Sequence, residues 1–147
     1  MNYRVFATLQ LPMILYCLVA LGSIAQGVRY LGGDEIADYH ESVIATPWEN
    51  IAPNYQRLLL GLYKGFGAGF LCVGLTIIVL VFIPFRAGDR WAVWATPGIA
   101  GVYWATLAYV TSSALLPGAN PIALSRVALG IVVLAAALSY FRNEPAE

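Results

Sequence analysis

Two cations lie inside apolar stretches of the sequence, and their types and positions are the first suggestion of chemistry. Lys64 directly follows Gly61-Leu62-Tyr63, and Arg126 lies about two turns into a later apolar stretch. A cation at the centre of a membrane span costs about 2.5–3.5 kcal/mol on insertion scales, and less near the ends. The pair could form a cationic pocket for a carboxylate, a lipid phosphate or a quinone-like headgroup. Snorkelling to the interface, or pairing with an acid such as Glu41, explains both residues without a ligand.

The other side chains that could do chemistry are few. His40 is the only histidine, so the sequence offers neither a bis-histidine haem site nor a zinc centre. His40 could carry a proton near the two cations, or it could be a solvated loop residue. Cys17 and Cys72 form no Cys-x-x-Cys pair, and we expect both to be small residues of the core.

No set of residues in the sequence predicts catalysis. There is no Ser/His/Asp constellation and no glycine loop that could hold a phosphate. We therefore expect no catalytic residue, no metal and no cofactor. The ligand-binding hypothesis comprises five residues, of which Trp104 is included because an aromatic near the middle of a span could line an apolar pocket. The five are Lys64, Arg126, His40, Glu41 and Trp104.

The composition indicates the class of protein in which these residues lie. Of the 147 residues, 60% are hydrophobic and 11% are charged, whereas soluble domains have about 25% charged residues. Mean hydropathy is +0.72. Eight basic residues balance eight acidic ones, so no positive field attracts nucleic acid. These values exclude a soluble enzyme and a nucleic-acid binder, and they predict an integral membrane protein.

Four apolar runs have about the length that a bilayer requires, near 20 residues each. Backbone hydrogen bonds must be satisfied within a span in lipid, so each run should be a helix. Short connections at 86–90 and 117–121 make the last three helices antiparallel neighbours. The sequence thus predicts one all-α domain over residues 1–147, a four-transmembrane-helix up-down bundle. Its expected helices are 6–26, 58–85, 91–115 and 122–141.

The remaining connection, residues 27–57, is long and holds five of the eight acids. Residues 34–44 carry apolar side chains on one face at helical spacing, which predicts an amphipathic helix. Thr46-Pro47-Trp48-Glu49 has the pattern of a capping box and predicts the start of a second short helix. We expect both helices at the membrane surface, with Tyr39 and Trp48 as interfacial anchors.

A stripe of small residues predicts close packing of the second long helix. Gly61, Gly65 and Gly69 recur every four residues, and Gly67 and Gly74 lie seven apart. The pattern does not identify the partner, which could be another helix of the bundle, a second copy of the chain or another protein.

The distribution of arginines weakly favours one orientation in the membrane. Basic residues divide equally between the two sides, but Arg86 and Arg90 flank a minimal loop, where the positive-inside effect is strongest. We therefore expect both termini in the cytoplasm and the acidic loop on the extracytoplasmic side.

Five short motifs resemble those of a group of short bacterial four-helix membrane proteins. The resemblance runs from residue 39 to residue 95, a little over a third of the chain. It implies a bacterial inner-membrane location and no activity. The motifs are Tyr39-His40, Pro47-Trp48-Glu49, Gly61-Leu62-Tyr63-Lys64-Gly65, Ile83-Pro84-Phe85-Arg86 and Arg90-Trp91-Ala92.

The function expected first is non-catalytic: binding of a lipid or another amphiphile, or service as an accessory subunit of a membrane assembly. The alternative is a quinone- or lipid-headgroup-handling enzyme that uses Lys64, Arg126 and His40. A second alternative is a small oligomeric transporter. No predicted span contains Asp or Glu, which argues against proton-coupled transport.

Overall fold

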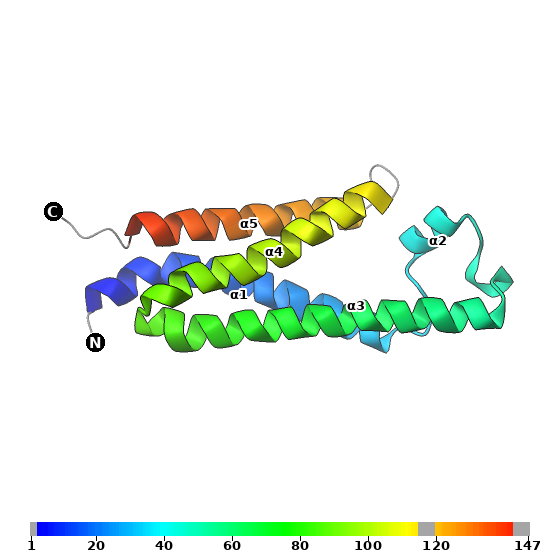
Figure 1. The fold of residues 1–147 in the computed structure, drawn as a ribbon, viewed down its shortest axis with the longest axis horizontal. Coiled ribbons are helices and arrows are strands. Elements are labelled where there is room, and N and C mark those ends of the chain that lie inside the picture. Colours follow the sequence, from blue (N-terminus) through cyan, green and yellow to red (C-terminus); the bar gives the residue numbers. More distant parts are fainter. Residues whose placement is uncertain (1–2, 115–119, 143–147) are drawn as a thin grey trace.

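The computed structural model describes residues 3–114 and 120–142, which form five α-helices and no strand. Four helices are long and one, α2, is short (Figure 1). The all-helical prediction is therefore confirmed. The helices are α1 (Tyr3–Gly32), α2 (Asp38–Ile44), α3 (Pro53–Leu80), α4 (Arg90–Ala114) and α5 (Asn120–Arg142).

The long helices alternate in direction, so that α1 begins and α5 ends at the same end of the bundle (Figure 1). The most extensive contacts are those of α1 with α3, α4 with α5, and α1 with α5. By contrast, α3 and α4 touch near their shared turn and then diverge toward the end that carries α2. One pair of the bundle is thus splayed at one end.

The turn between α3 and α4 is short, as expected. A π-helical turn, Val81–Phe85, extends α3 and contains Pro84. Proline lacks an N–H and its ring crowds the preceding turn, and a wider π turn accommodates both effects. The Gly88 N–H then donates to the Phe85 carbonyl at 3.0 Å, and Gly88 has a positive φ of 83°. Four residues, 86–89, therefore bring α3 and α4 together.

The first connection is shorter than predicted. The first helix continues to Gly32 rather than ending near residue 26, because residues 27–32 contain no proline, and Arg29 in the last turn complements the helix dipole. The amphipathic helix covers only Asp38–Ile44 and ends at Ala45, whose φ is 55°. The expected helix over residues 34–37 is therefore absent.

The second short helix does begin at the predicted motif, but the predicted side-chain cap is absent. Trp48–Asn50 is a single 3₁₀ turn with no side-chain cap, and the Thr46 hydroxyl donates to the Ile44 carbonyl at 3.4 Å instead. Pro53 explains why no helix continues from there. A residue before proline is pushed to extended geometry, and Ala52 has φ −59° and ψ 140°. The segment between the two prolines is too short for an α-helix.

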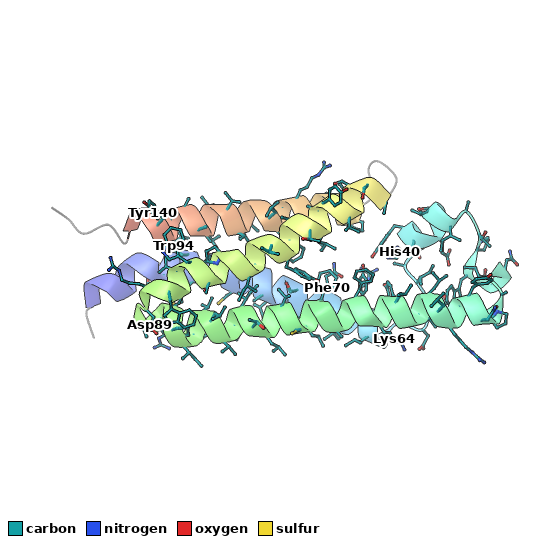
Figure 2. All side chains as sticks on the ribbon, viewed as in Figure 1. His40, Lys64, Phe70, Asp89, Trp94 and Tyr140 are labelled. Carbon is teal, nitrogen blue, oxygen red and sulfur yellow. The ribbon has the colours of Figure 1, made fainter. Side chains whose placement is uncertain are left out.

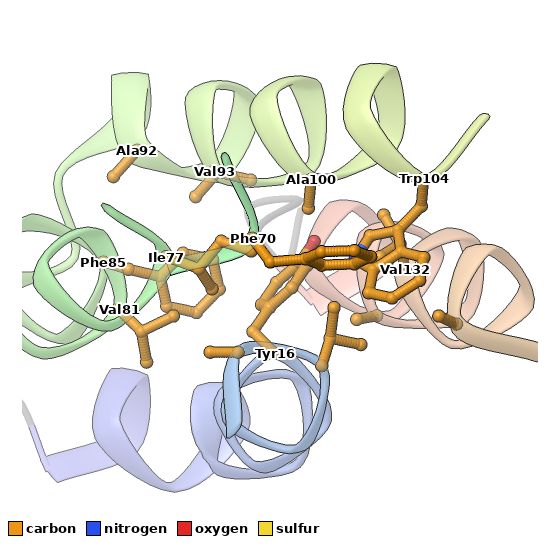
Figure 3. Close-up of a cluster of buried hydrophobic side chains, with 14 residues drawn as sticks. Tyr16, Phe70, Ile77, Val81, Phe85, Ala92, Val93, Ala100, Trp104 and Val132 are labelled. Atoms are coloured by element: carbon orange, nitrogen blue, oxygen red, sulfur yellow. The ribbon is translucent and has the colours of Figure 1, made fainter. Parts of the chain in front are cut away.

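A single large core lies between the long helices. Figure 3 shows its side chains from all four, with Tyr16 of α1 facing Phe85 at a ring distance of 5.7 Å. Both rings are fully buried. Some buried hydroxyls are satisfied locally, as where Ser139 donates to the Ala135 carbonyl at 2.7 Å, or across helices, as between Thr111 and Ser125 at 3.0 Å. The buried Thr96 hydroxyl has no hydrogen-bond partner among the described residues.

The outward faces of the helices are also apolar. Three helical stretches are long and apolar enough to cross a membrane, and only 28–33% of their most apolar windows is buried inside the structure. A water-soluble monomer rarely exposes so much apolar surface. The stretches are Gln10–Gly32, Pro53–Phe85 and Pro121–Tyr140. α4, which contains five Trp and Tyr residues, is not among them.

Candidate functional site

A cavity of about 350 Å³ lies at the splayed end of the bundle, between α3, α4 and α2. Its walls are mostly hydrocarbon and aromatic rings, and it is partly open. The lining residues are Tyr30, Ile36, Tyr39, His40, Val43, Ile44, Leu59, Leu62, Tyr63, Phe66, Phe70, Leu107, Val110, Thr111, Ala114 and Pro121.

Aromatic rings between α3 and α4 mark the inner end of this cavity. Phe70 of α3 lines it and lies 5.5 Å from the Tyr103 ring and 6.0 Å from the Trp104 ring of α4 (Figure 2). Rings of this size hold the two helices further apart than the alanines that line the core nearer the turn. The cavity is therefore a consequence of the size of the side chains at this level.

His40 is the polar residue of greatest interest in the cavity. Figure 2 shows it below α2, toward α3, and its ring meets the Tyr63 ring edge-on at 5.7 Å. The Nε2 atom is buried and has no hydrogen-bond partner among the described residues. Burial lowers the pKa of the imidazole, which favours its neutral form. A buried polar atom without a partner is costly, so this nitrogen is suited to a ligand atom.

A tyrosine pair holds α2 over the cavity. The hydroxyl groups of Tyr39 on α2 and Tyr30 on α1 are hydrogen-bonded to each other, and Tyr30 stacks on Tyr63 at 4.0 Å. Burial, and then the bond to Tyr30, raise the pKa of Tyr39, which stays a neutral phenol. The bond connects the short helix to the bundle through one side chain.

Glycines determine how closely Tyr30 can approach α3. A Cβ at Gly67 would lie 2.8 Å from the Tyr30 Cβ and 3.1 Å from the Gly27 carbonyl oxygen. A Cβ at Gly74 would lie 2.7 Å from Ile24 Cγ1. These two glycines, seven residues apart, therefore form the close contact between α3 and α1.

The predicted stripe has a different environment. At Gly61, Gly65 and Gly69, a Cβ would meet nothing within 4 Å among the described residues. The stripe does not pack against the part of the chain that the structure describes, and its proposed role in contacts with a partner stays a prediction.

A second cavity of about 650 Å³ adjoins the first, between the end of α1 and the starts of α2 and α5. It contains charged groups, Arg29 and Asp38, together with Gln26. Tyr39 and Pro121 line both cavities and therefore separate them.

The structure does not bring the two predicted cations to either cavity. Lys64 is half-buried and lies on the side of α3 away from α2 (Figure 2). Arg126 is exposed on α5 and donates to the Ser112 hydroxyl of α4 at 3.2 Å. Both lie toward the α2 end of the bundle, as their positions along the helices predicted.

The remaining predicted residues have separate environments. Glu41 is half-buried on α2 and lines neither cavity. Trp104 is 2% exposed in the core, behind Phe70, and its indole Nε1 has no partner among the described residues. Of the five residues of the ligand-binding hypothesis, only His40 lines a cavity.

Sequence reasoning missed Arg29 and the three tyrosines as site residues. Arg29 follows an uninterrupted helical stretch, which could have indicated that it belongs to α1 and not to the loop. Within the described residues no three His, Cys, Asp or Glu side chains lie together as a metal site requires, and Cys17 and Cys72 are free thiols.

No protein-family model, curated protein or solved structure matches the chain.

Proposed function

We propose that the chain is a multi-pass protein of the bacterial inner membrane that binds a lipid or another amphiphile in the cavity between α3 and α4. One observation carries the proposal: an apolar cavity of about 350 Å³ contains a buried imidazole nitrogen that has no partner among the described residues. Ligand cavities are typically about 300–1,000 Å³, apolar, and equipped with a few polar groups that orient the ligand. A hydrocarbon chain fits the walls, and an ester or hydroxyl group fits His40.

The apolar outer surface supports insertion in a membrane, and the antiparallel arrangement supports four spans. α4 runs beside α5 along most of its length. Near one end the Trp94 ring lies 5.6 Å from the Tyr140 ring, and near the other end the Thr111 hydroxyl is hydrogen-bonded to that of Ser125. Its Trp and Tyr residues lower its hydropathy, but aromatic rings are common where spans meet the interface. A helix placed between two spans must follow them across the bilayer. Both termini then lie on the same side of the membrane as the turn that carries Arg86 and Arg90. These arginines favour the cytoplasm for that side.

The catalytic alternative has less support. It required Lys64 and Arg126 beside His40, and neither residue lines the cavity that His40 lines. The amphiphile-binding function needs only His40 and the apolar walls, so the geometry favours it.

The test is retention of lipid by the purified chain, measured by native mass spectrometry after extraction in a mild detergent. Ala114→Trp places a large ring in the cavity from an exposed position and should lower retention about tenfold. Ala105→Trp is the matched control, because Ala105 is exposed on the same helix and lines neither cavity. Equal retention by wild type and Ala114→Trp would refute the proposal.

A second function, as an accessory subunit or homo-oligomer, is favoured by the open stripe on α3. In lipid, small residues let two helices approach closely, and a Cβ at Gly65 would meet nothing within 4 Å among the described residues. We propose that a helix of a partner or of a second copy occupies this face. Gly65→Leu should then dissociate an assembly seen by native mass spectrometry, and a wild-type chain that is purely monomeric and purifies alone would contradict this function.

A further inference from the structure

The cavity that holds Arg29 and Asp38 has no role in the proposed function so far, although it adjoins the apolar cavity. Arg29 belongs to the last turn of α1, and Asp38 is the first residue of α2. Both are exposed, and no ion pair joins them in the described part of the chain. The cavity thus offers a separate cation and anion, and the amide of Gln26, one turn before Arg29, adds neutral donors and an acceptor.

We propose that this cavity binds the headgroup of a zwitterionic phospholipid with a primary ammonium, whose acyl chain lies in the apolar cavity. The inference rests on the proposed function, and it names the class of lipid. The Arg29 guanidinium would bind the phosphate, and the Asp38 carboxylate would bind the ammonium.

Charge complementarity favours this headgroup over the two simpler ones. A purely anionic head beside Arg29 would also face Asp38, and a purely cationic head would face Arg29. A guanidinium matches a phosphate through paired N–H donors, and a carboxylate binds an N–H donor more strongly when the donor is charged. A quaternary ammonium has no N–H to donate, so a primary ammonium is the better match for Asp38.

The relation between the two cavities explains how one molecule can occupy both. Tyr39 and Pro121 line each of them, so the headgroup and the chain are separated by the width of these side chains. His40, next to Tyr39, lies on the apolar side, and its Nε2 has no partner in the part of the chain that the structure describes. The order across the site is therefore an acyl chain, a linkage region beside His40 and Tyr39, then a phosphate and an ammonium.

The test uses the full chain in nanodiscs that contain equal amounts of palmitoyl-oleoyl phosphatidylethanolamine, phosphatidylglycerol and phosphatidylcholine. After release of the bulk lipid, native mass spectrometry identifies what the chain retains. We expect phosphatidylethanolamine to be retained about tenfold over the other two lipids. This preference should be lost in Asp38→Asn and kept in Asp38→Glu, which also controls for any effect on the start of α2.

Loss of the cation should have a different signature. Arg29→Gln should lower retention of all three phospholipids, because each carries a phosphate. Arg57→Gln is the matched control, since Arg57 is exposed at the same end of the bundle and lines neither cavity. An equal loss in Arg57→Gln would overturn the assignment of the phosphate to Arg29.

Failure of this inference can be distinguished from failure of the proposed function. Lipid retained without headgroup preference, or a preference that survives Asp38→Asn, overturns the headgroup assignment alone. Retention that is absent from wild type, or that is the same in Ala114→Trp, overturns both.

Discussion

The two ends of the bundle are packed differently, although the same four helices form both. At the end with the short turn, Tyr16 and Phe85 meet edge-on, and each is fully buried. At the other end, α3 and α4 diverge, and two cavities lie beneath and beside α2. The tight end holds the helices together, and the open end is the part that could hold a ligand.

The difference follows from which residues lie between the helices. Near the turn, Ala92 and Ala100 of α4 are fully buried, so α3 can approach closely. Further along, the rings of Phe70 and Trp104 occupy the space between α3 and α4. A four-residue turn that fixes one end, together with large rings further along, produces the splay. Stability and binding should therefore respond to substitutions at opposite ends.

The largest expected effect comes from removing a ring at the tight end. Phe85→Ala should lower the free energy of unfolding by about 3 kcal/mol, because the cavity it leaves has no atoms to fill it. The loss should fall at the low end of the range for buried phenylalanines, because lipid removes part of the hydrophobic driving force. Phe66→Ala removes the same ring at the open end, where Phe66 is 55% exposed, and should change stability by no more than about 0.5 kcal/mol.

Unfolding in mixed detergent micelles measures both variants under the same conditions. Similar losses for the two phenylalanines would mean that the open end contributes as much to stability as the tight end, and the comparison would fail.

The next effect concerns glycines on two faces of α3. Gly67→Ala would place a Cβ 2.8 Å from the Tyr30 Cβ and should destabilise the chain by about 1–3 kcal/mol, as overpacking does. In the monomeric chain a Cβ at Gly65 meets open space, so Gly65→Ala should be neutral or slightly stabilising, because alanine is the better helix former. The same unfolding measurement separates them, and an equal cost at Gly65 would show that its face is packed against another helix.

Much of the fold could be predicted from the sequence, because a long apolar run indicates both that a helix is present and roughly where it begins and ends. The third predicted helix, 91–115, begins one residue after the start of α4, Arg90–Ala114, and its last predicted residue lies outside the described residues. The first helix was predicted to end six residues early, because hydropathy falls near Arg29 whereas helix formation continues. The capping-box motif starts only a single 3₁₀ turn, because Pro53, five residues beyond Trp48, prevents the longer helix that local chemistry favours.

The candidate site was harder to predict, since it depends on the rotation of helices about their axes. Lys64 and Arg126 lie toward the same end of the bundle, but depth does not determine the direction in which a side chain points. The position of His40 depends on how α2 folds back. The hydrogen bond between Tyr39 and Tyr30 and the burial of Ile36 and Trp48 against Tyr63 hold this segment in place. The sequence contains two glycine patterns on α3, and only the contacts of Gly67 and Gly74 with Tyr30 and Ile24 of α1 reveal which pattern packs within the chain.

A smaller effect should come from loosening the open end. Tyr39→Phe keeps the ring and removes its hydroxyl, so the hydrogen bond to Tyr30 is lost at a cost of about 0.5–1.5 kcal/mol. The loss should appear as faster amide hydrogen exchange in residues 38–44, with exchange near Phe85 unchanged. Tyr55→Phe is the control, because Tyr55 is an exposed tyrosine of the same end that lines neither cavity. Faster exchange along the whole chain would show that the two ends unfold as one unit.

The smallest effect should be the pH dependence that His40 gives to the open end. Burial lowers the pKa of His40 in the folded chain below its ordinary value of 6.5. The unfolded chain therefore binds a proton more readily, and stability is lost as the pH falls below about 6.5 toward the lower folded pKa. His40→Gln should remove this contribution. Exchange of residues 38–44 at pH 7.5 and pH 5.5, corrected for intrinsic rates, measures it. An acid-induced opening of the same size in His40→Gln would assign the effect to the neighbouring carboxylates instead.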